Sequence, residues 1–201
     1  MRRAGSTENG YQMIELLIAL AISSLVLGFG VPPLLSLAAG LRVELAAAEV
    51  ASAFHVARAY AIRHDANVGL KFEVGADGTV TWALYRDGDG DGVLSADIRS
   101  GDDPQVLPPT RLAHLGRQIR FGFPPGRPPR DPGDPRRRLS GLDDPIRFNR
   151  SDIASFSALG TATPGTVYVT DGMRHLGAAR VSGRTGRIDR LAYDVATERW
   201  H

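Results

Sequence analysis

The chain has 201 residues, which is enough for one domain of ordinary size and an additional anchoring segment. It contains no cysteine, which excludes a disulfide framework, thiolate metal sites and thiol catalysis. The formal net charge is only +2, so the overall charge does not require a polyanionic partner.

The N-terminal region is dominated by an apolar segment. From Gly10 to Leu35 the only charged side chain is that of Glu15. About 20 apolar residues can cross the hydrocarbon core of a bilayer as a helix, so residues 11–33 are predicted to form a transmembrane helix. Two arginines precede it and should keep the N-terminus in the cytoplasm. An ionisable group inside such a segment is costly, which makes Glu15 a candidate functional residue.

The start of this segment carries a motif. The sequence G-Y-Q-M-I-E-L-L, which begins at Gly10, resembles the class III signal of type IV prepilins and type II secretion pseudopilins. The resemblance implies that a prepilin peptidase removes the leader, residues 1–10, by cutting between Gly10 and Tyr11. It also implies N-methylation of Tyr11 and makes Glu15 the fifth residue of the mature chain. The family usually has Phe and then Thr or Ser after the glycine, whereas this chain has Tyr11 and Gln12.

Cleavage at this site would leave a free α-amine four residues before Glu15, at the membrane edge. The carboxylate of one subunit could then pair with the amine of a neighbour, which would cancel both charges and set the axial register of the packed helices. In one alternative, Glu15 only extends to the membrane interface. In another, a conventional signal peptidase cuts near Ala39 and releases a secreted domain.

A helical pattern continues beyond Pro32-Pro33, where the loss of two backbone donors predicts a kink or local melting. Apolar residues recur at intervals of three and four through residues 34–65, which predicts an amphipathic continuation of the helix. The stripe begins with Leu37, Leu41 and Leu45. Its second half is expected to pack on the globular domain, and a partner surface is the alternative.

Residues 66–201 are predicted to form a β-rich globular domain. Alternating residues at 68–74 and 80–84, separated by Asp77-Gly78, indicate a β-hairpin. Further predicted strands are Gln118–Phe123, Pro145–Asn149, Thr166–Thr170, Ala178–Ser182 and Arg187–Asp194. One long helix followed by strands indicates an α+β fold in which the helix covers an antiparallel sheet. This agrees with the pilin-like fold that the N-terminal motif implies.

The segment 124–145 is rich in Pro, Gly and Arg and offers almost nothing to bury. It is therefore predicted to be a disordered loop between strands. Its five arginines could contact a polyanion, but four aspartates offset most of their charge.

An acidic segment resembles the first half of an EF-hand calcium loop. The candidate calcium ligands are Asp87, Asp89, Asp91, Val93 and Asp97. Glycines let the chain wrap, and Gly92 occupies the position of the sharp turn. Ile98 stands where a bidentate glutamate is expected, so calcium affinity should be weak, although Asp97, Asp102 or Asp103 could substitute for that ligand. The alternative is a polar hairpin without a ligand.

The C-terminal part, residues 166–188, resembles the end of the GspH/FimT group of pilin-like proteins, in which a strand pair is followed by a Gly-Arg turn. In some minor pilins of that group this turn contacts DNA during uptake. The candidate DNA contacts here are Arg184, Arg187 and Arg190. Asp189 dilutes this basic patch, and few aromatic residues are available to stack on bases.

The five histidines share no metal-ligand spacing, and no catalytic or phosphate-binding motif is present, so enzymatic activity is not expected. The resemblance predicts a minor pilin or pseudopilin at the tip of a type II secretion pseudopilus or a type IV pilus. It implies a single pass through the bacterial inner membrane and a periplasmic globular domain. The implied partners are the prepilin peptidase and other pilins or pseudopilins. The alternatives are a DNA-binding minor pilin for uptake and a secreted calcium-binding domain.

Overall fold

The computed structural model describes residues 8–75, 79–116, 118–183 and 185–201. The predicted turn at Asp77-Gly78 lies outside these residues. The chain divides into two compact units between Ala39 and Gly40. The helix α1 (Glu8–His64) supplies all the described residues of the first unit and the N-terminal part of the second.

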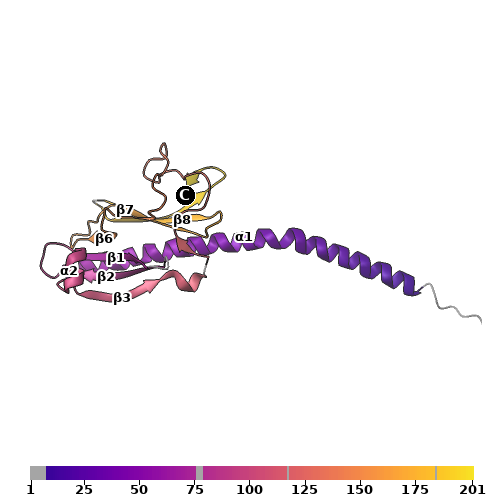
Figure 1. Ribbon diagram of the computed structural model, residues 1–201, viewed down its shortest axis with the longest axis horizontal. Helices are drawn as coiled ribbons and strands as arrows, with labels where there is room; N and C mark the ends of the chain where they lie inside the picture. Colours follow the sequence, from indigo (N-terminus) through magenta and orange to yellow (C-terminus); the bar gives the residue numbers. More distant parts are fainter. Residues whose placement is uncertain (1–7, 76–78, 117, 184) are drawn as a thin grey trace, which may run out of the picture. The chain divides into compact units, whose positions relative to one another are not determined.

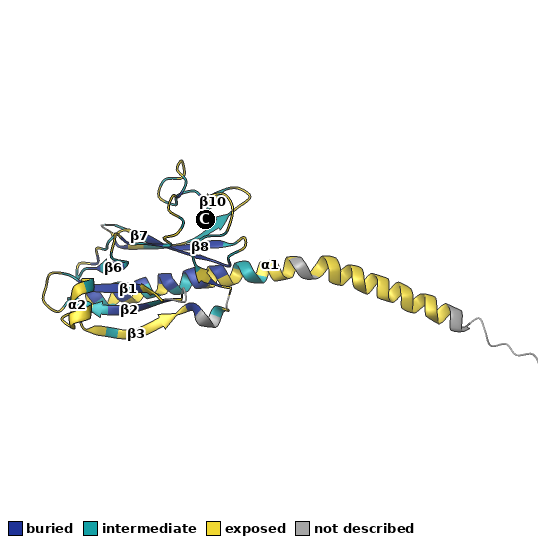
Figure 2. Ribbon diagram, in the orientation of Figure 1, coloured by how far each residue is buried: buried dark blue, intermediate teal, exposed yellow. Residues whose placement is uncertain are grey.

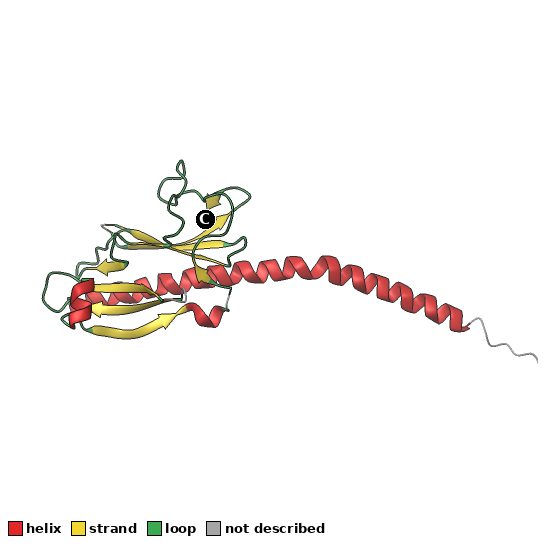
Figure 3. Cartoon of the chain, in the orientation of Figure 1, coloured by secondary structure: helices red, strands yellow, loops and turns green. Residues whose placement is uncertain are grey.

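The helix α1 is continuous in its secondary structure, as Figure 3 shows. The predicted local melting at Pro32-Pro33 is therefore wrong, because both prolines lie within the helix. The fixed φ of proline is close to the helical value, so the cost of each proline lies in a lost hydrogen bond and local crowding rather than in an incompatible dihedral angle.

The second unit contains two antiparallel sheets. The first has the order β3-β2-β1-β6, formed by β1 (Val68–Val74), β2 (Val80–Arg86), β3 (Gln105–Arg111) and β6 (Ile153–Phe156). The second has the order β10-β9-β8-β7-β4, and β5 also pairs with β7. Its strands are β4 (Arg120–Phe121), β5 (Ile146–Arg147), β7 (Gly165–Thr170), β8 (Leu176–Ser182), β9 (Arg187–Asp194) and β10 (Arg199–Trp200). Two short helices complete the unit, α2 (Ser95–Ser100) and the 3-10 helix η1 (Leu112–Leu115).

The α+β fold and the β1–β2 hairpin are confirmed, with Phe72 opposite Trp82 in the antiparallel register. Strands β3, β6 and β10 were not predicted from the sequence. Strand β3 contains Pro108-Pro109, beside which the register with β2 shifts. Prolines in a sheet are confined to edges and bulges, and β3 is an edge strand.

The second half of α1 forms one core with both sheets. In Figure 1, β7 and β8 lie on one side of this part of the helix, and β2 and β3 lie on the other. Its buried residues, dark blue in Figure 2, are Val43, Ala46, Ala47, Val50, Ala51, Phe54, Ala57 and Ala61. Phe54 contacts Phe72 and Phe148 edge to face, with ring centroids 6.1 and 5.5 Å away. The helix approaches β8 closely at Gly177, where a Cβ would lie 3.2 Å from the Cβ of Ala47.

A buried carboxylate organises the turn between β7 and β8. Oδ1 of Asp171 accepts hydrogen bonds from the backbone amides of Met173, Arg174 and His175, and its Oδ2 lies 2.6 Å from Nδ1 of His175. Burial alone would raise the pKa of Asp171, but these hydrogen bonds outweigh it and lower the pKa to about 2. The His175 ring lies against α1 at Gly40, where a Cβ would be 3.0 Å from Cδ2 of the ring.

The segment 124–145 forms a loop with defined contacts, so the prediction of disorder is wrong. Leu139 is buried and belongs to a second apolar cluster with Tyr168, against which Leu142 and Trp200 pack. The indole Nε1 of Trp200 donates a 2.7 Å hydrogen bond to the carbonyl oxygen of Arg130. Two leucines and these aromatic contacts order a segment whose composition alone indicated nothing to bury.

Candidate functional site

The first unit presents an exposed apolar helix. All residues from 11 to 30 are exposed, including Leu16 at 70% and Phe29 at 79%. Leu37, Leu41 and Leu45 are exposed as well, at 63%, 52% and 57%. By length and composition, α1 is a helix that could cross a membrane. An exposed apolar surface of this extent is typical of a segment that contacts lipid or a partner protein.

Polar groups in this helix are few and mostly satisfied. The hydroxyls of Ser23 and Ser24 donate to the carbonyl oxygens of Ala19 and Leu20 at 2.8 and 2.7 Å, so they need no partner in lipid. Glu15 is exposed, and it makes no hydrogen bond or ion pair with any residue that the structure describes. The carboxylate of Glu15 is therefore available to a group from another molecule.

The acidic loop follows β2 and brings three carboxylates together. Oxygen atoms of Asp87, Asp89 and Asp91 lie within 4.8 Å of one another. Oδ1 of Asp87 accepts a hydrogen bond from the amide of Gly90, at 2.7 Å, and its Oδ2 accepts one from the amide of Gly92, at 3.0 Å. Both glycines have positive φ, 95° and 100°, which lets the chain wrap around the carboxylates.

Asp97 of α2 does not join this group of three, although its charge interacts with it. Its Oδ2 is buried and has no hydrogen-bond partner among the residues that the structure describes. Desolvation, followed by repulsion from Asp89, raises the pKa of both Asp91 and Asp97. A divalent cation among these groups would relieve the repulsion, and carboxylate oxygens are the ligands that calcium prefers. The donor set therefore fits calcium, without the bidentate twelfth ligand.

The candidate DNA contacts do not form one patch in the part of the chain that the structure describes. Arg184 lies outside the described residues. Arg187 and Arg190 both lie on β9, three positions apart, and therefore point to opposite faces of the sheet. Nε of Arg187 is 2.7 Å from Oδ1 of Asp189, so its charge is partly neutralised.

Comparisons with known proteins give few matches. No family model matches the sequence, and no curated protein is similar to it. Among solved structures, the chain is similar to two of the minor pseudopilin EpsH from the type 2 secretion system of Vibrio cholerae. The first has 12% sequence identity and a TM-score of 0.43, and covers 75% of this chain and 97% of the other. The second has 10% identity and a TM-score of 0.45, over 76% and 95% of the two chains.

Two residues support the acidic loop in a way that the sequence did not predict. Nδ2 of Asn67 donates to Oδ2 of Asp87 at 3.0 Å and helps to orient that carboxylate. Asp103 is 1% exposed, and its two oxygens accept hydrogen bonds from the amides of Gly88 and Leu94, at 3.1 and 2.9 Å. Asp103 is not one of the grouped carboxylates, and its oxygens hold the backbone of the loop. The sequence could not reveal this role, because Asp103 is one of several aspartates that follow the loop.

Proposed function

We propose that this chain is a minor pilin or pseudopilin subunit of a type II secretion pseudopilus or a type IV pilus. A prepilin peptidase cuts between Gly10 and Tyr11, and Tyr11 is then N-methylated. The processed chain crosses the inner membrane once, with its globular domain in the periplasm. It assembles with other pilins or pseudopilins through α1 and occupies the filament tip.

The observation that carries this proposal is the exposed apolar face of α1 with its single carboxylate. Every residue from 11 to 30 is exposed, and Glu15 is the one charged residue between Tyr11 and Leu41. A membrane anchor alone has no use for a carboxylate at this depth, whereas a neighbour's terminal amine would compensate its charge. Cleavage after Gly10 makes Tyr11 the mature N-terminus, and the free α-amine of Tyr11 supplies that partner.

Processing gives the direct test. When the full chain is co-expressed with a prepilin peptidase, intact-mass spectrometry should find a chain that begins at a methylated Tyr11. Gly10→Val should retain the leader, because in the family that the motif resembles the peptidase cuts after a glycine. Gly28→Ala is the matched control, since a Cβ there meets nothing within 4 Å. A wild-type chain that begins at Gly40 would instead support conventional secretion, and an uncleaved one would contradict the proposal.

We also propose that the acidic loop binds calcium through Asp87, Asp89 and Asp91, with the Val93 carbonyl and Asp97 as further ligands. The convergence of three carboxylate oxygens within 4.8 Å favours this function. Calcium tolerates irregular oxygen coordination better than magnesium does. Bound calcium would hold α2 and the loop to the end of β2, and so stiffen one end of the globular domain.

Calcium should therefore stabilise the chain. At a concentration about ten times the dissociation constant it should add about 1.4 kcal/mol and raise the melting temperature by about 3–5 °C. Asp89→Asn should abolish this shift, because it removes one of the three grouped carboxylates. Asp102→Asn is the control, because Asp102 accepts a hydrogen bond from Ser100 and lies outside the group. Equal shifts in both variants, measured by thermal melting in a non-ionic detergent, would argue against the site.

A further inference from the structure

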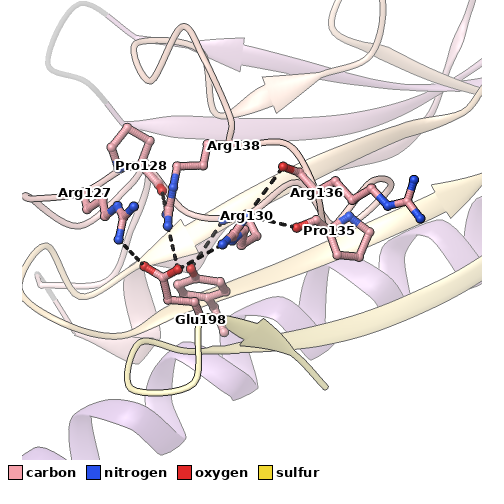
Figure 4. Close-up of polar contacts among 8 residues, drawn as sticks. Arg127, Pro128, Arg130, Pro135, Arg136, Arg138 and Glu198 are labelled. Atoms are coloured by element: carbon pink, nitrogen blue, oxygen red, sulfur yellow. Dashed lines mark hydrogen bonds and ion pairs between the residues drawn. The ribbon is translucent and has the colours of Figure 1, made fainter.

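Three arginines of the loop 124–145 converge on Glu198, as Figure 4 shows. Oε1 of Glu198 lies 3.1 Å from Nη1 of Arg127, and its Oε2 lies 3.4 Å from Nη2 of Arg130 and 2.5 Å from Nη2 of Arg138. Glu198 has a φ of 54°, which is unfavourable for a side chain with a Cβ and costs on the order of 1 kcal/mol. The fold thus places a carboxylate among these arginines at some cost in backbone conformation.

The charges in this cluster do not balance. One carboxylate faces three guanidinium groups, which leaves a surplus of two positive charges. The hydrogen bond from Arg138 and the nearby Arg127 charge lower the pKa of Glu198. The carboxylate is therefore ionised, and its single negative charge cannot neutralise all three arginines. The Arg127 side chain is 72% exposed, and among the described residues it pairs only with Glu198. Since a guanidinium carries five N–H donors, most donors of Arg127 remain available to a second anion.

A cavity of about 170 Å³ opens beside this cluster. Arg127, Arg138, Arg174 and Glu198 supply its charged lining, with a net charge of +2. Arg174 comes from the β7–β8 turn, is exposed, and has no ion pair with the residues that the structure describes. The remaining walls are largely apolar, formed in part by Pro124, Pro125, Tyr193 and Val195. We name this cavity the arginine pocket.

We propose that the arginine pocket binds an acidic side chain of a partner protein. The partner's carboxylate accepts hydrogen bonds from Arg127 and Arg174, and a neighbouring apolar side chain of the partner contacts the proline and tyrosine wall. Arginine binds carboxylates well because its planar donors can form two parallel hydrogen bonds. The size of the pocket suits one or two side chains. This inference does not depend on processing at Gly10 or on the membrane helix.

The arrangement of charge favours an acidic protein segment over DNA. A nucleic-acid strand requires cations spaced along its phosphates, often with aromatic side chains on which bases stack. Here the positive charges converge on one point around Glu198. The guanidinium of Arg136, on the same loop, points away from Glu198 in Figure 4 and does not belong to the cluster.

The test uses the full chain in a non-ionic detergent and a fluorescein-labelled peptide of glutamates with one leucine. Binding measured by fluorescence anisotropy should weaken about 5- to 10-fold in Arg127→Gln and in Arg174→Gln, since each removes a charge-assisted contact. It should also weaken between about 50 and 300 mM salt. Arg136→Gln is the matched control and should leave the affinity unchanged. The melting temperatures of the three variants should stay close to that of the wild type, because these side chains are exposed.

Three results would overturn the assignment. The first is the absence of peptide binding at about millimolar concentration, which corresponds to less than about 4 kcal/mol. The second is an equal loss of affinity in Arg136→Gln, which would indicate attraction by general charge. The third is a short DNA duplex that displaces the peptide and binds more tightly than it, with the same dependence on Arg127 and Arg174; this would identify the pocket as part of a nucleic-acid surface.

Discussion

Replacement of Asp171 by alanine should destabilise the globular domain by about 3 kcal/mol, because three backbone amides and the His175 ring would lose a buried acceptor. Asp171 is 7% exposed, so water does not readily replace it. Urea unfolding of the full chain in a non-ionic detergent, followed by tryptophan fluorescence, measures the change. Asp194→Ala is the control. Asp194 accepts similar hydrogen bonds in the β9–β10 turn, but these are exposed to water, so their loss should lower the free energy of unfolding much less.

The carboxylate of Asp171 should also make the free energy of unfolding depend on pH in the acidic range. Its folded pKa of about 2 lies below the ordinary value of 3.8, so its contribution is complete above pH 4 and is lost as the pH falls towards 2. The difference corresponds to about 2 kcal/mol. Asp171→Asn keeps an acceptor but cannot titrate, and it should reduce the loss of stability over this pH range. An unchanged acid profile in Asp171→Asn would assign the titration to other groups.

Replacement of Glu15 by glutamine should prevent assembly without preventing membrane insertion. If the carboxylate pairs with the terminal amine of a neighbour in a low-dielectric environment, its removal leaves a buried charge unpaired, at a cost of about 3–5 kcal/mol. Incorporation into filaments should then fall by on the order of 100-fold or more. The amount of chain that copurifies with filaments from cells that carry the matching assembly proteins measures this effect.

Glu44→Gln is the matched control for this experiment. Glu44 is also an exposed acid on α1, but it lies in the second unit, beyond the apolar segment. It should assemble as the wild type does. Normal assembly of Glu15→Gln would favour the alternative in which Glu15 only reaches the membrane interface.

The sequence predicted those elements whose pattern is local. The apolar segment after Gly10 and the periodic spacing up to His64 predicted one long helix, and alternation predicted β1 and β2. Strand β3 escaped prediction because it contains Pro108-Pro109, and local propensity argues against a strand there. Pairing with β2 forms it nonetheless, with a shift of register beside the prolines.

The loop 124–145 shows a different limit of sequence reasoning. Its composition indicated disorder, yet Leu139 packs with Tyr168 of β7, and Trp200 near the C-terminus binds the backbone of Arg130. These contacts join residues that lie far apart in the sequence, so composition within the loop could not reveal them. The arginine pocket has the same origin, since Glu198 lies 60 residues after Arg138.

In the acidic loop, the spacing of Asp87, Asp89 and Asp91 predicted their convergence, because glycines between carboxylates allow a tight wrap. The spacing did not distinguish Asp103, which holds the loop backbone, from a cation ligand. That distinction depends on burial and on which amides lie nearby. Such information is not contained in the order of acidic residues.

The position of strand β3 at the edge of its sheet affects how copies of this domain can meet. Strand β3 is one of the two outer strands of its sheet, and an outer strand with free amides can join the sheet of another molecule and start aggregation. Pro108 and Pro109 have no amide hydrogen to offer, so a foreign strand cannot form a regular ladder along β3. The two prolines therefore oppose edge-to-edge pairing of β3 with the sheet of another copy.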